Sequence, residues 1–502
     1  MPSDQHAILV IDLAFGDSGK GSIVDFLARR GQPPLVVRFN GGPQAGHNVV
    51  TADGRHHTFS QFGSATFVPG SRTFLSRFML IEPYAMLNEA EHLHSIGSHD
   101  ALSRLLIDEN CPIITPCHQA ANRLHELARG ADAHGTCGMG VGEVMQDLNP
   151  PVLSPPPVLR GRVREGVLAN GASSTQPPPR PSLGVPGEGE KPSASAMLFA
   201  RDLVDRPKII NTLGNLRDLK IAQLRDAIRD LRGHPKASFA IQTLLDPAWL
   251  ETAADHYAQV ASRAYILNEP KAHALLRDTT HLLFEGAQGV LLDESFGFHP
   301  HTTWSTTTFA NAHTLLREAG FEGRQTRLGV LRTYFTRHGP GPFVTEDSQL
   351  RRHLLEPHND DAGWQGAFRV GTFDAVAARY AIAVAGGVDA LAITHLDRPP
   401  QLPPRICNAY RYDGSNEHLI KRDGVVVDLR PSAPHDFPAR ERLTRALREC
   451  RPIHQEFASP KPHSILPEIE REVGAAVAIT SLGPTAQDKR INSSTGPISW
   501  NL

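Results

Sequence analysis

The feature that most constrains the fold of this chain is a glycine-rich turn near its start, Gly16-Asp17-Ser18-Gly19-Lys20-Gly21. An apolar run at residues 7–11 precedes the turn, and apolar residues at helical spacing follow it within residues 23–27. This order predicts a buried strand, a tight turn and a helix. Glycines let such a turn close on an anion, and the start of a helix presents unpaired N–H groups and the positive end of its dipole. We therefore expect a phosphate at this turn, with Lys20 as its counter-charge.

The spacing of the turn differs from that of the standard phosphate loop. That loop has four residues between its first glycine and its Gly-Lys pair. Fewer residues separate Gly16 from the Gly19-Lys20 pair here. At this point an ordinary tight turn stays open as the alternative.

Beyond the turn, apolar strand patterns alternate with helical patterns. Such alternation is typical of an α/β fold with a mainly parallel central sheet flanked by helices. A further helix is expected to begin near Phe309. The other expected strands are at 35–39, 281–285, 328–334, 390–394 and 475–480, and the other helices are at 81–97, 116–129, 213–231, 247–267, 374–384 and 465–473.

Composition changes sharply between about residue 150 and residue 196, where Pro, Gly and Ser dominate. Such a segment cannot bury enough apolar area to fold alone, so we expect a largely disordered insertion. The arginines within it, Arg160, Arg162 and Arg164, are expected to form a solvated segment rather than a site.

The overall charge favours small-molecule partners. A formal net charge of −2 over 502 residues argues against bulk electrostatic binding to nucleic acid or to a membrane surface. The first residues lack the features of a secretory signal and no apolar run is long enough to span a bilayer, so we expect a cytoplasmic protein. The five cysteines are scattered without a C-x-x-C pair, and most are expected to be reduced and structural.

Glycine-rich loops follow two of the expected strands, at residues 41–47 and 286–289. Open α/β sheets bind ligands at the carboxyl ends of their strands, so these loops are candidate ligand contacts. A third glycine-rich, hydroxyl-bearing loop, residues 135–142, comes after the expected helix at 116–129. Each of these features also has a structural alternative. His47 could be an ordinary loop histidine that is hydrogen-bonded to the backbone, and residues 135–142 could be a flexible connector. The hydroxyl-rich run 302–308 exceeds what capping a helix needs, which suggests phosphate or sugar contacts.

Asp397 lies just beyond the expected strand at 390–394. A carboxylate there can accept hydrogen bonds from both N1 and N2 of guanine, whereas adenine offers no such pair of donors. Asp397 would therefore select GTP over ATP. The alternative is an ordinary cap of a helix or turn.

Taken together, these motifs resemble those of the adenylosuccinate synthetases. The resemblance implies a single large domain, residues 1–502, with a P-loop-like GTP-dependent ligase architecture interrupted by the insertion at about 150–196. It also implies a homodimer, Mg²⁺, and the conversion of IMP, L-aspartate and GTP to adenylosuccinate, GDP and phosphate. The matching motifs run in family order: 16–21, 41–47, 135–142, 284–289, 336–343, 394–397 and 481–484.

The resemblance also implies residue roles. Asp17 matches the base that takes the N1 proton of IMP, and it ligates Mg²⁺ together with the backbone carbonyl of Gly46. His47 matches a donor to the phosphate or to O6. The GTP phosphates would be held by Gly16, Ser18, Gly19, Lys20 and Gly21, the guanine by Asp397, Ser481, Gly483 and Pro484, and IMP by Gln44, Thr136, Cys137, Gln288 and Thr303.

Several positions depart from the family pattern. Ser18 stands where the family usually has Glu, Gln44 where it has Asn, and Cys137 where a phosphate-binding Thr is expected. The family's cross-dimer arginine has no match because the chain runs into Pro150-Pro151. That contact is either lost or supplied from Arg160 or Arg162.

The largest departure lies where the family binds aspartate through consecutive arginines. Only Arg369 remains in the matching stretch, and Arg337 with His338 could complete the site. A half-paired carboxylate costs about 1.5–3 kcal/mol, so a dicarboxylate needs more than one fixed donor. Three functions stay open: a divergent adenylosuccinate synthetase, a related ligase with another 6-oxopurine nucleotide such as a guanylate or another amine donor, and a non-catalytic GTP-binding protein.

Overall fold

The computed structural model describes residues 5–130, 133–149, 197–354, 356, 364–397, 405–456 and 462–492. The Pro-rich segment at about 150–196, with Arg160, Arg162 and Arg164, lies outside the described residues, so the expectations for it are not tested.

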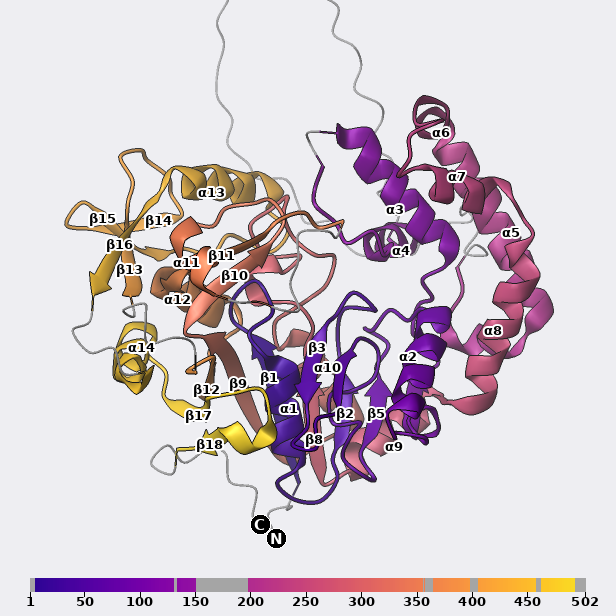
Figure 1. Ribbon diagram of the computed structural model, residues 1–502, viewed down its shortest axis with the longest axis horizontal. Helices are drawn as coiled ribbons and strands as arrows, with labels where there is room; N and C mark the ends of the chain where they lie inside the picture. The colour runs from indigo at the N-terminus through magenta and orange to yellow at the C-terminus, as the bar shows by residue number, and fades with distance from the viewer. Residues whose placement is uncertain are drawn as a thin grey trace, which may run out of the picture.

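A ten-stranded sheet forms the centre of the molecule (Figure 1). Its strand order is β18-β17-β12-β9-β1-β8-β2-β5-β6-β7, and every neighbouring pair is parallel except β17 and β18. The α/β class and the mainly parallel sheet are therefore confirmed. The strands are β1 (His6–Asp12), β2 (Leu35–Arg38), β5 (Arg72–Leu75), β6 (Leu105–Asp108), β7 (Tyr265–Leu267), β8 (His281–Glu285), β9 (Arg324–Arg332), β12 (Ala390–Thr394), β17 (Val477–Ser481) and β18 (Lys489–Ile491).

Both faces of this sheet are covered, which is why its central strands are apolar throughout. Successive side chains of β1 alternate between two cores. Ile8 and Val10 pack with α1 (Lys20–Ala28), while Leu9 and Ile11 pack with helices of the opposite face. Those helices are α9 (Glu269–Asp278), α10 (Ala310–Ala319) and α12 (Ala375–Val384).

Two further units flank the large sheet in Figure 1. A six-stranded sheet, drawn in orange and yellow, is built from β10 (Tyr334–His338), β11 (Phe368–Asp374), β13 (Arg405–Arg411), β14 (Leu419–Arg422), β15 (Val425–Leu429) and β16 (Arg451–Glu456), with α11 (Ser348–His353), α13 (Phe437–Glu449) and α14 (Leu466–Val473) nearby. On the other side lie α2 (Pro83–Ser95), α3 (Pro116–Arg129), α4 (Val141–Leu148), α5 (Arg206–Gln223), α6 (Arg225–Asp230), α7 (Ser238–Leu245) and α8 (Trp249–Arg263). A hairpin, β3 (His47–Val50) and β4 (His56–Phe59), follows the loop after β2.

Local structure departs from the sequence-based expectations at three places. The helix expected at 213–231 is two helices, because Leu224 leaves the helical backbone while its side chain stays buried. The helix expected at 247–267 ends at Arg263, and the aromatic and aliphatic residues 265–267 pair with β6 as an edge strand. The strand expected at 328–334 is interrupted at Thr333, where the chain leaves the large sheet and enters the six-stranded one.

Candidate active site

The candidate site lies where adjacent parallel strands of the large sheet end. Strands β17, β12, β9, β1, β8 and β2 are consecutive neighbours, so the loops after them meet along one edge. These loops line a cavity of about 890 Å³. The expected residues that border it are Gly16, Asp17, Gly19, Lys20, Gly21, Gln44, Gly46, His47, Thr136, Cys137, Gln288, Thr303, Arg337, Asp397, Ser481, Gly483 and Pro484. Ser18 and Arg369 are not among the lining residues.

The phosphate turn is shaped by Asp12, a buried carboxylate at the end of β1. Its Oδ1 accepts the backbone N–H groups of Ala14 (2.8 Å) and Gly16 (3.3 Å), and its Oδ2 accepts that of Ser18 (2.8 Å). Oδ2 also lies 3.2 Å from Nζ of Lys20. Sequence reasoning missed Asp12, although a carboxylate ending a buried strand just before a glycine-rich turn is a visible signal.

Close backbone contacts join the turn to its neighbours. Lys20 Nζ donates to the carbonyl of Gln288 at 2.9 Å, which ties the turn to the loop after β8. A Cβ added at Gly289 would lie 2.2 Å from the carbonyl oxygen of Ala14, and one at Gly21 would lie 2.7 Å from Cβ of His47. Only glycine lets these segments approach so closely.

Asp17 has a left-handed backbone with φ of 60°. A non-glycine residue in that region costs about 1–2 kcal/mol, although Asp tolerates it better than most residues. Buried Arg332 donates from Nε to the carbonyl of Asp17, and its Nη1 is 2.8 Å from Oε1 of Glu356. The Asp17 carboxylate lies 3.5 Å from Nε2 of His338. The surrounding residues thus hold the catalytic candidate in a strained conformation at the cavity wall.

His47 forms a buried pair with Glu285, the last residue of β8. Its Nδ1 lies 2.6 Å from Oε1 of Glu285, and the backbone N–H of Ser64 donates to Oε2 at 3.0 Å. Burial alone would raise the pKa of Glu285, but His47, Arg38 and Ser64 outweigh it and lower that pKa to about 2. We therefore assign the Nδ1 proton to the bond with this carboxylate, which leaves Nε2 of His47 for a ligand.

The protonation of His47 is set by opposing effects. Burial lowers its pKa, and the negative charge of Glu285 opposes that fall. An anion bound in the cavity would also raise the pKa of His47, because a negative charge stabilises the imidazolium. Glu285 was part of a motif in the sequence, but its pairing with His47 was not foreseen.

Some amide groups in the cavity wall lack partners among the described residues. They are Nε2 and Oε1 of Gln44 and Oε1 of Gln288, all buried. Buried polar atoms are nearly always hydrogen-bonded, so unpartnered ones at a cavity wall point to a ligand.

The loop before α4 is pinned from α3. Glu126 accepts the backbone N–H groups of Gly135 (2.8 Å) and Thr136 (3.1 Å), and Thr136 Oγ1 donates to Asn122 at 3.2 Å. Thr136 and Cys137 therefore border the cavity on a loop with defined shape, and burial raises the pKa of the Cys137 thiol.

One hydroxyl of the run before α10 reaches the start of that helix. The N-cap residue, Phe309, makes no side-chain hydrogen bond, but Thr308 Oγ1 accepts the backbone N–H of Ala310 at 3.4 Å. Thr307 Oγ1 contacts Gly289 O and Asp293 Oδ2, both at 3.2 Å, so part of the hydroxyl surplus braces the loop after β8. Thr303 borders the cavity.

One end of the cavity is formed where β12 and β17 finish. The backbone N–H of Leu396 donates to the carbonyl of Ser481 at 3.1 Å, so the two strand-end loops are joined. Asp397 borders the cavity next to the loop carrying Ser481, Gly483 and Pro484. The carboxylate Asp397 and the loop after β17 thus border the cavity side by side.

The expected arginines of the amino-acid end have different surroundings. Arg337 is buried and donates to the carbonyls of Pro340 (3.1 Å) and Pro342 (3.1 Å). Burial, with Arg369 and Arg448 nearby, lowers its pKa, and no carboxylate of the described residues pairs with it. Arg369 is paired with Glu346 at 2.8 Å and donates to the carbonyls of Gly339 and Gly341. Nη2 of Arg337 donates to the carbonyl of His301 at 3.3 Å, so Arg337 borders the cavity as a cation bonded to carbonyls but to no carboxylate of the described residues, whereas Arg369 braces the loop behind it.

The donor set fits a nucleotide-bound Mg²⁺. The Asp17 carboxylate and Gly46 border the cavity together, and the described residues contain no group of three or more His, Cys, Asp or Glu side chains that could cage a metal. Mg²⁺ commonly uses one or two carboxylates, waters and substrate phosphates rather than a cage made of protein alone.

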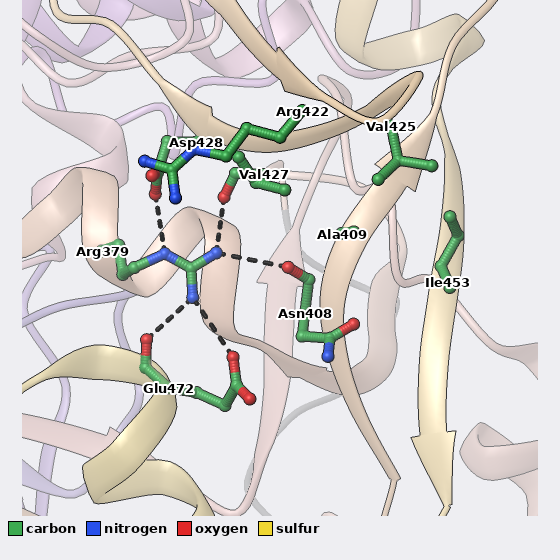
Figure 2. A pocket seen from close by; sticks show the side chains of 9 residues that line it. All are labelled: Arg379, Asn408, Ala409, Arg422, Val425, Val427, Asp428, Ile453 and Glu472. Carbon is green, nitrogen blue, oxygen red and sulfur yellow. Dashed lines mark hydrogen bonds and ion pairs between the residues drawn. The ribbon is translucent and has the colours of Figure 1, made fainter.

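A second hollow, of about 600 Å³, lies beside the six-stranded sheet (Figure 2). At its wall, Arg379 Nε is 2.7 Å from Oδ1 of Asp428, and its Nη1 donates to the carbonyl of Glu472 at 2.8 Å. Its Nη2 donates to the carbonyls of Asn408 and Val427, as the dashed lines in Figure 2 mark. The arginine is therefore saturated by the protein itself.

The described residues include no helix with the length and apolar character needed to cross a membrane. All five cysteines are free thiols, and Cys137 alone of them is not fully buried.

Comparisons with known proteins give a consistent picture. The family model described as adenylosuccinate synthetase matches residues 9–149 and 213–490. An adenylosuccinate synthetase of Nitrosospira multiformis is 32% identical over 392 residues, which covers 78% of this chain and 76% of that protein. The solved structure of fully ligated adenylosuccinate synthetase from Plasmodium falciparum has a TM-score of 0.70 at 18% identity, covering 98% of this chain and 100% of the other. A cyanophage S-2L succinoaminodeoxyadenylate synthetase, bound to dGMP and dATP, has a TM-score of 0.55 at 17% identity, covering 97% and 95%.

Proposed function

The chain belongs to the adenylosuccinate synthetase family, and we propose that its cavity joins IMP to L-aspartate, using GTP, to give adenylosuccinate, GDP and phosphate. One observation carries the assignment of chemistry to residues. Asp17, Lys20 and His47 border the same cavity as Gln288, whose amide oxygen has no partner among the described residues. The cavity therefore brings together four proposed roles: Asp17 as the base, Lys20 as the counter-charge of the phosphates, His47 as a donor to the charge that develops, and Gln288 as a purine contact.

In the proposed first step, the 6-oxo group of IMP becomes a nucleophile. The Asp17 carboxylate takes the proton from N1, and the electron pair moves so that O6 attacks the γ-phosphorus of GTP. The O6–P bond forms while the bond between the γ-phosphorus and the β–γ bridging oxygen breaks, and GDP leaves. The protein contributes position and charge neutralisation, as is usual in phosphoryl transfer.

The phosphates are proposed to be held by Lys20 and by those backbone N–H groups of residues 16–21 that do not donate to Asp12. His47 donates from Nε2 to the transferring group, and Glu285 stabilises the imidazolium that this requires. A bound Mg²⁺, held by Asp17 and the carbonyl of Gly46, would neutralise phosphate charge when present. Ser18 contributes to the shape of the turn rather than to phosphate binding, because its backbone N–H donates to Asp12.

In the proposed second step, the amine of aspartate attacks C6 and the 6-phosphoryl group leaves as phosphate. Arg337, which pairs with no carboxylate of the described residues, borders the cavity and is the proposed partner for a carboxylate of this substrate. Arg369, held by Glu346, supports it indirectly by fixing the carbonyls of Gly339 and Gly341. IMP is proposed to contact Gln44, Thr136, Cys137, Gln288 and Thr303, and guanine to contact Asp397, Ser481, Gly483 and Pro484.

We further propose that the protein acts in the cytoplasm as a homodimer, with the residues of 1–502 outside the Pro-rich insertion forming one domain. This rests on family membership. Sedimentation of the purified protein checks the oligomeric state.

Turnover of defined substrates tests the function. The protein is incubated with GTP, Mg²⁺, either IMP or a guanylate, and each amino acid in turn, and the products are identified by mass spectrometry. We expect adenylosuccinate only when IMP and L-aspartate are both present. Release of phosphate from GTP in the presence of IMP but without aspartate would contradict the proposal. GTP binding without turnover of any combination of nucleotide and amino acid would indicate a non-catalytic protein.

A further inference from the structure

We propose that Lys489 is a positioning residue for the base of GTP, because its buried ammonium group holds the loop after β17 in the shape that recognises guanine together with Asp397. The inference rests on the proposed function, since it presumes that GTP occupies this cavity.

Lys489 lies directly behind that loop. It is the first residue of β18, it pairs with Ser481 of β17 in the antiparallel register, and it is 5% exposed. Its Nζ lies 3.3 Å from the carbonyl oxygens of Gly483 and Pro484 and 2.9 Å from that of Thr485. A protonated lysine has three N–H donors, so each is matched by one carbonyl of the loop.

The same loop presents its other side to the cavity. Ser481, Gly483 and Pro484 border the cavity with Asp397, whereas Lys489 does not. Lys489 therefore acts through the backbone of the loop and not by touching the nucleotide. Without Lys489, the carbonyl of Pro484 would lose its donor, and the loop would lose the one group that ties this carbonyl to those of Gly483 and Thr485.

Other contacts hold the ends of the loop and leave its centre to Lys489. Asp488 accepts the backbone N–H and the hydroxyl of Thr485 at 2.8 and 2.6 Å, and the N–H of Leu482 donates to the Asp488 carbonyl at 3.0 Å. Ser481 Oγ donates to Gly483 O at 3.0 Å. Among these contacts, the carbonyl of Pro484 is served by Lys489 alone.

The charge state of Lys489 is sensitive to pH in a useful range. Burial lowers its pKa to about 8, against the attraction of Asp25 on α1, Asp488 beside the loop and Asp397 beyond β12. No carboxylate of the described residues forms an ion pair with Nζ, so the carbonyls are its direct partners. Below pH 8 the ammonium serves the three carbonyls, and above it the neutral amine has only two N–H donors. GTP binding is therefore expected to weaken as the pH rises through about 8.

The first test compares Lys489→Met with a matched control, Lys421→Met. Lys421 also bridges loop carbonyls, those of Tyr412 (2.7 Å) and Gly414 (2.9 Å), but it is exposed and is not among the residues that line the cavity. For Lys489→Met we expect the KM for GTP to rise about 10- to 100-fold. We expect kcat and the KM values for IMP and aspartate to change less than about 3-fold. The preference for GTP over ITP, a nucleotide that lacks the 2-amino group, should fall about 10-fold. Lys421→Met should change none of these quantities.

The second test is the pH profile, which does not depend on a variant that folds poorly. In the wild-type protein, the KM for GTP should rise about tenfold between pH 7 and pH 9, and the KM for IMP should rise less. Lys489→Arg keeps its charge over this range, so its GTP profile should be flat.

The outcomes separate the two proposals. If Lys489→Met keeps the wild-type KM for GTP and the wild-type preference over ITP, Lys489 has only a structural role and the inference is wrong, even when the melting temperature falls. The same follows if the wild-type GTP profile is flat between pH 7 and pH 9. If wild-type protein binds no fluorescent GTP analogue at all, the proposed function fails and the inference falls with it.

Discussion

The two hollows of this molecule differ in how their polar groups are satisfied. In the hollow beside the six-stranded sheet, the Arg379 guanidinium is bonded to Asp428, to Glu472 and to backbone carbonyls. In the cavity at the sheet edge, both amide atoms of Gln44 and Oε1 of Gln288 lack partners, and Arg337 is bonded to backbone carbonyls but to no carboxylate of the described residues. The two hollows therefore differ in unsatisfied polar groups as well as in volume.

The backbone shows the same contrast. Asp17, Gln288 and His395, all at the cavity, have positive φ values of 60°, 56° and 59°. None of the residues lining the other hollow is among the residues with positive φ. Strain of this kind persists only where the surroundings hold it, and it gathers at sites of function. The comparison predicts that substitutions at the cavity change kinetics and that substitutions at the other hollow change only stability.

The largest effect is expected for Asp17→Asn. Removing the proposed base should lower kcat by at least about 10³-fold, while the affinity for GTP stays within about 3-fold. Steady-state kinetics and binding of a fluorescent GTP analogue measure the two quantities. Asp423→Asn is the matched control, because Asp423 also has a left-handed backbone, with φ of 48°, but lies outside the cavity lining. An active Asp17→Asn variant would show that the base is another group.

The next effect is expected for Glu285→Gln. The neutral amide would no longer stabilise a charged His47, so kcat should fall about 10²-fold. Glu89→Gln is the control, since Glu89 makes a comparable buried contact with His57, at 3.4 Å, away from the cavity lining. Equal kcat losses in both variants would mean that the Glu285 effect is one of folding rather than of the site.

A smaller change, confined to one substrate, is expected for Asp397→Asn. An amide can accept only one of the two hydrogen bonds from N1 and N2 of guanine, so the KM for GTP should rise about 10-fold. The KM for IMP should be unchanged, and the ratio of GTP to ATP use should fall. Competition assays with mixed nucleotides measure that ratio. An unchanged ratio would remove Asp397 from base recognition.

The smallest kinetic effect is expected for Arg379→Met. Loss of its hydrogen bonds leaves backbone carbonyls without donors, so the protein should be less stable by about 1–3 kcal/mol. Chemical denaturation measures this loss. All KM values and kcat should stay within about 2-fold of the wild type, as expected for ordinary substitutions away from a site. A marked kinetic change would erase the distinction between the two hollows.

How much of the site could be predicted depends on how local each feature is. The strand, turn and helix around residues 16–21 follow from patterns within one short segment, and helix 116–129 was predicted with the bounds that α3 has. Glu285 and Arg332 were missed as site residues because their roles appear only when separate strands become neighbours. Asp12 was missed although its partners, from Ala14 to Lys20, are local in the sequence. Glu285 meets His47, and Arg332 meets Asp17, across a sheet whose strand order the sequence does not display.

The same reasoning explains the other differences. The six-stranded sheet was not predicted, because β10 follows β9 after a single residue and the strand expected at 328–334 ran from one into the other, and because β13 pairs with the distant segment β16. The expectation for Arg369 came from a motif and could not reveal that Glu346 lies close enough to pair with it. The role of Lys489 was likewise invisible, since its contacts exist only when β18 turns back along β17.

The hydrogen bonds of Asp12 have a consequence for how fast and how tightly a nucleotide can bind. Because the N–H groups of Ala14, Gly16 and Ser18 already bond to this carboxylate, the turn takes its shape during folding rather than on contact with phosphate. The ordering entropy of these residues is therefore already lost in the free protein. A preorganised turn of this kind binds a nucleotide more tightly than a flexible turn with the same contacts. It also needs no slow rearrangement after the nucleotide arrives.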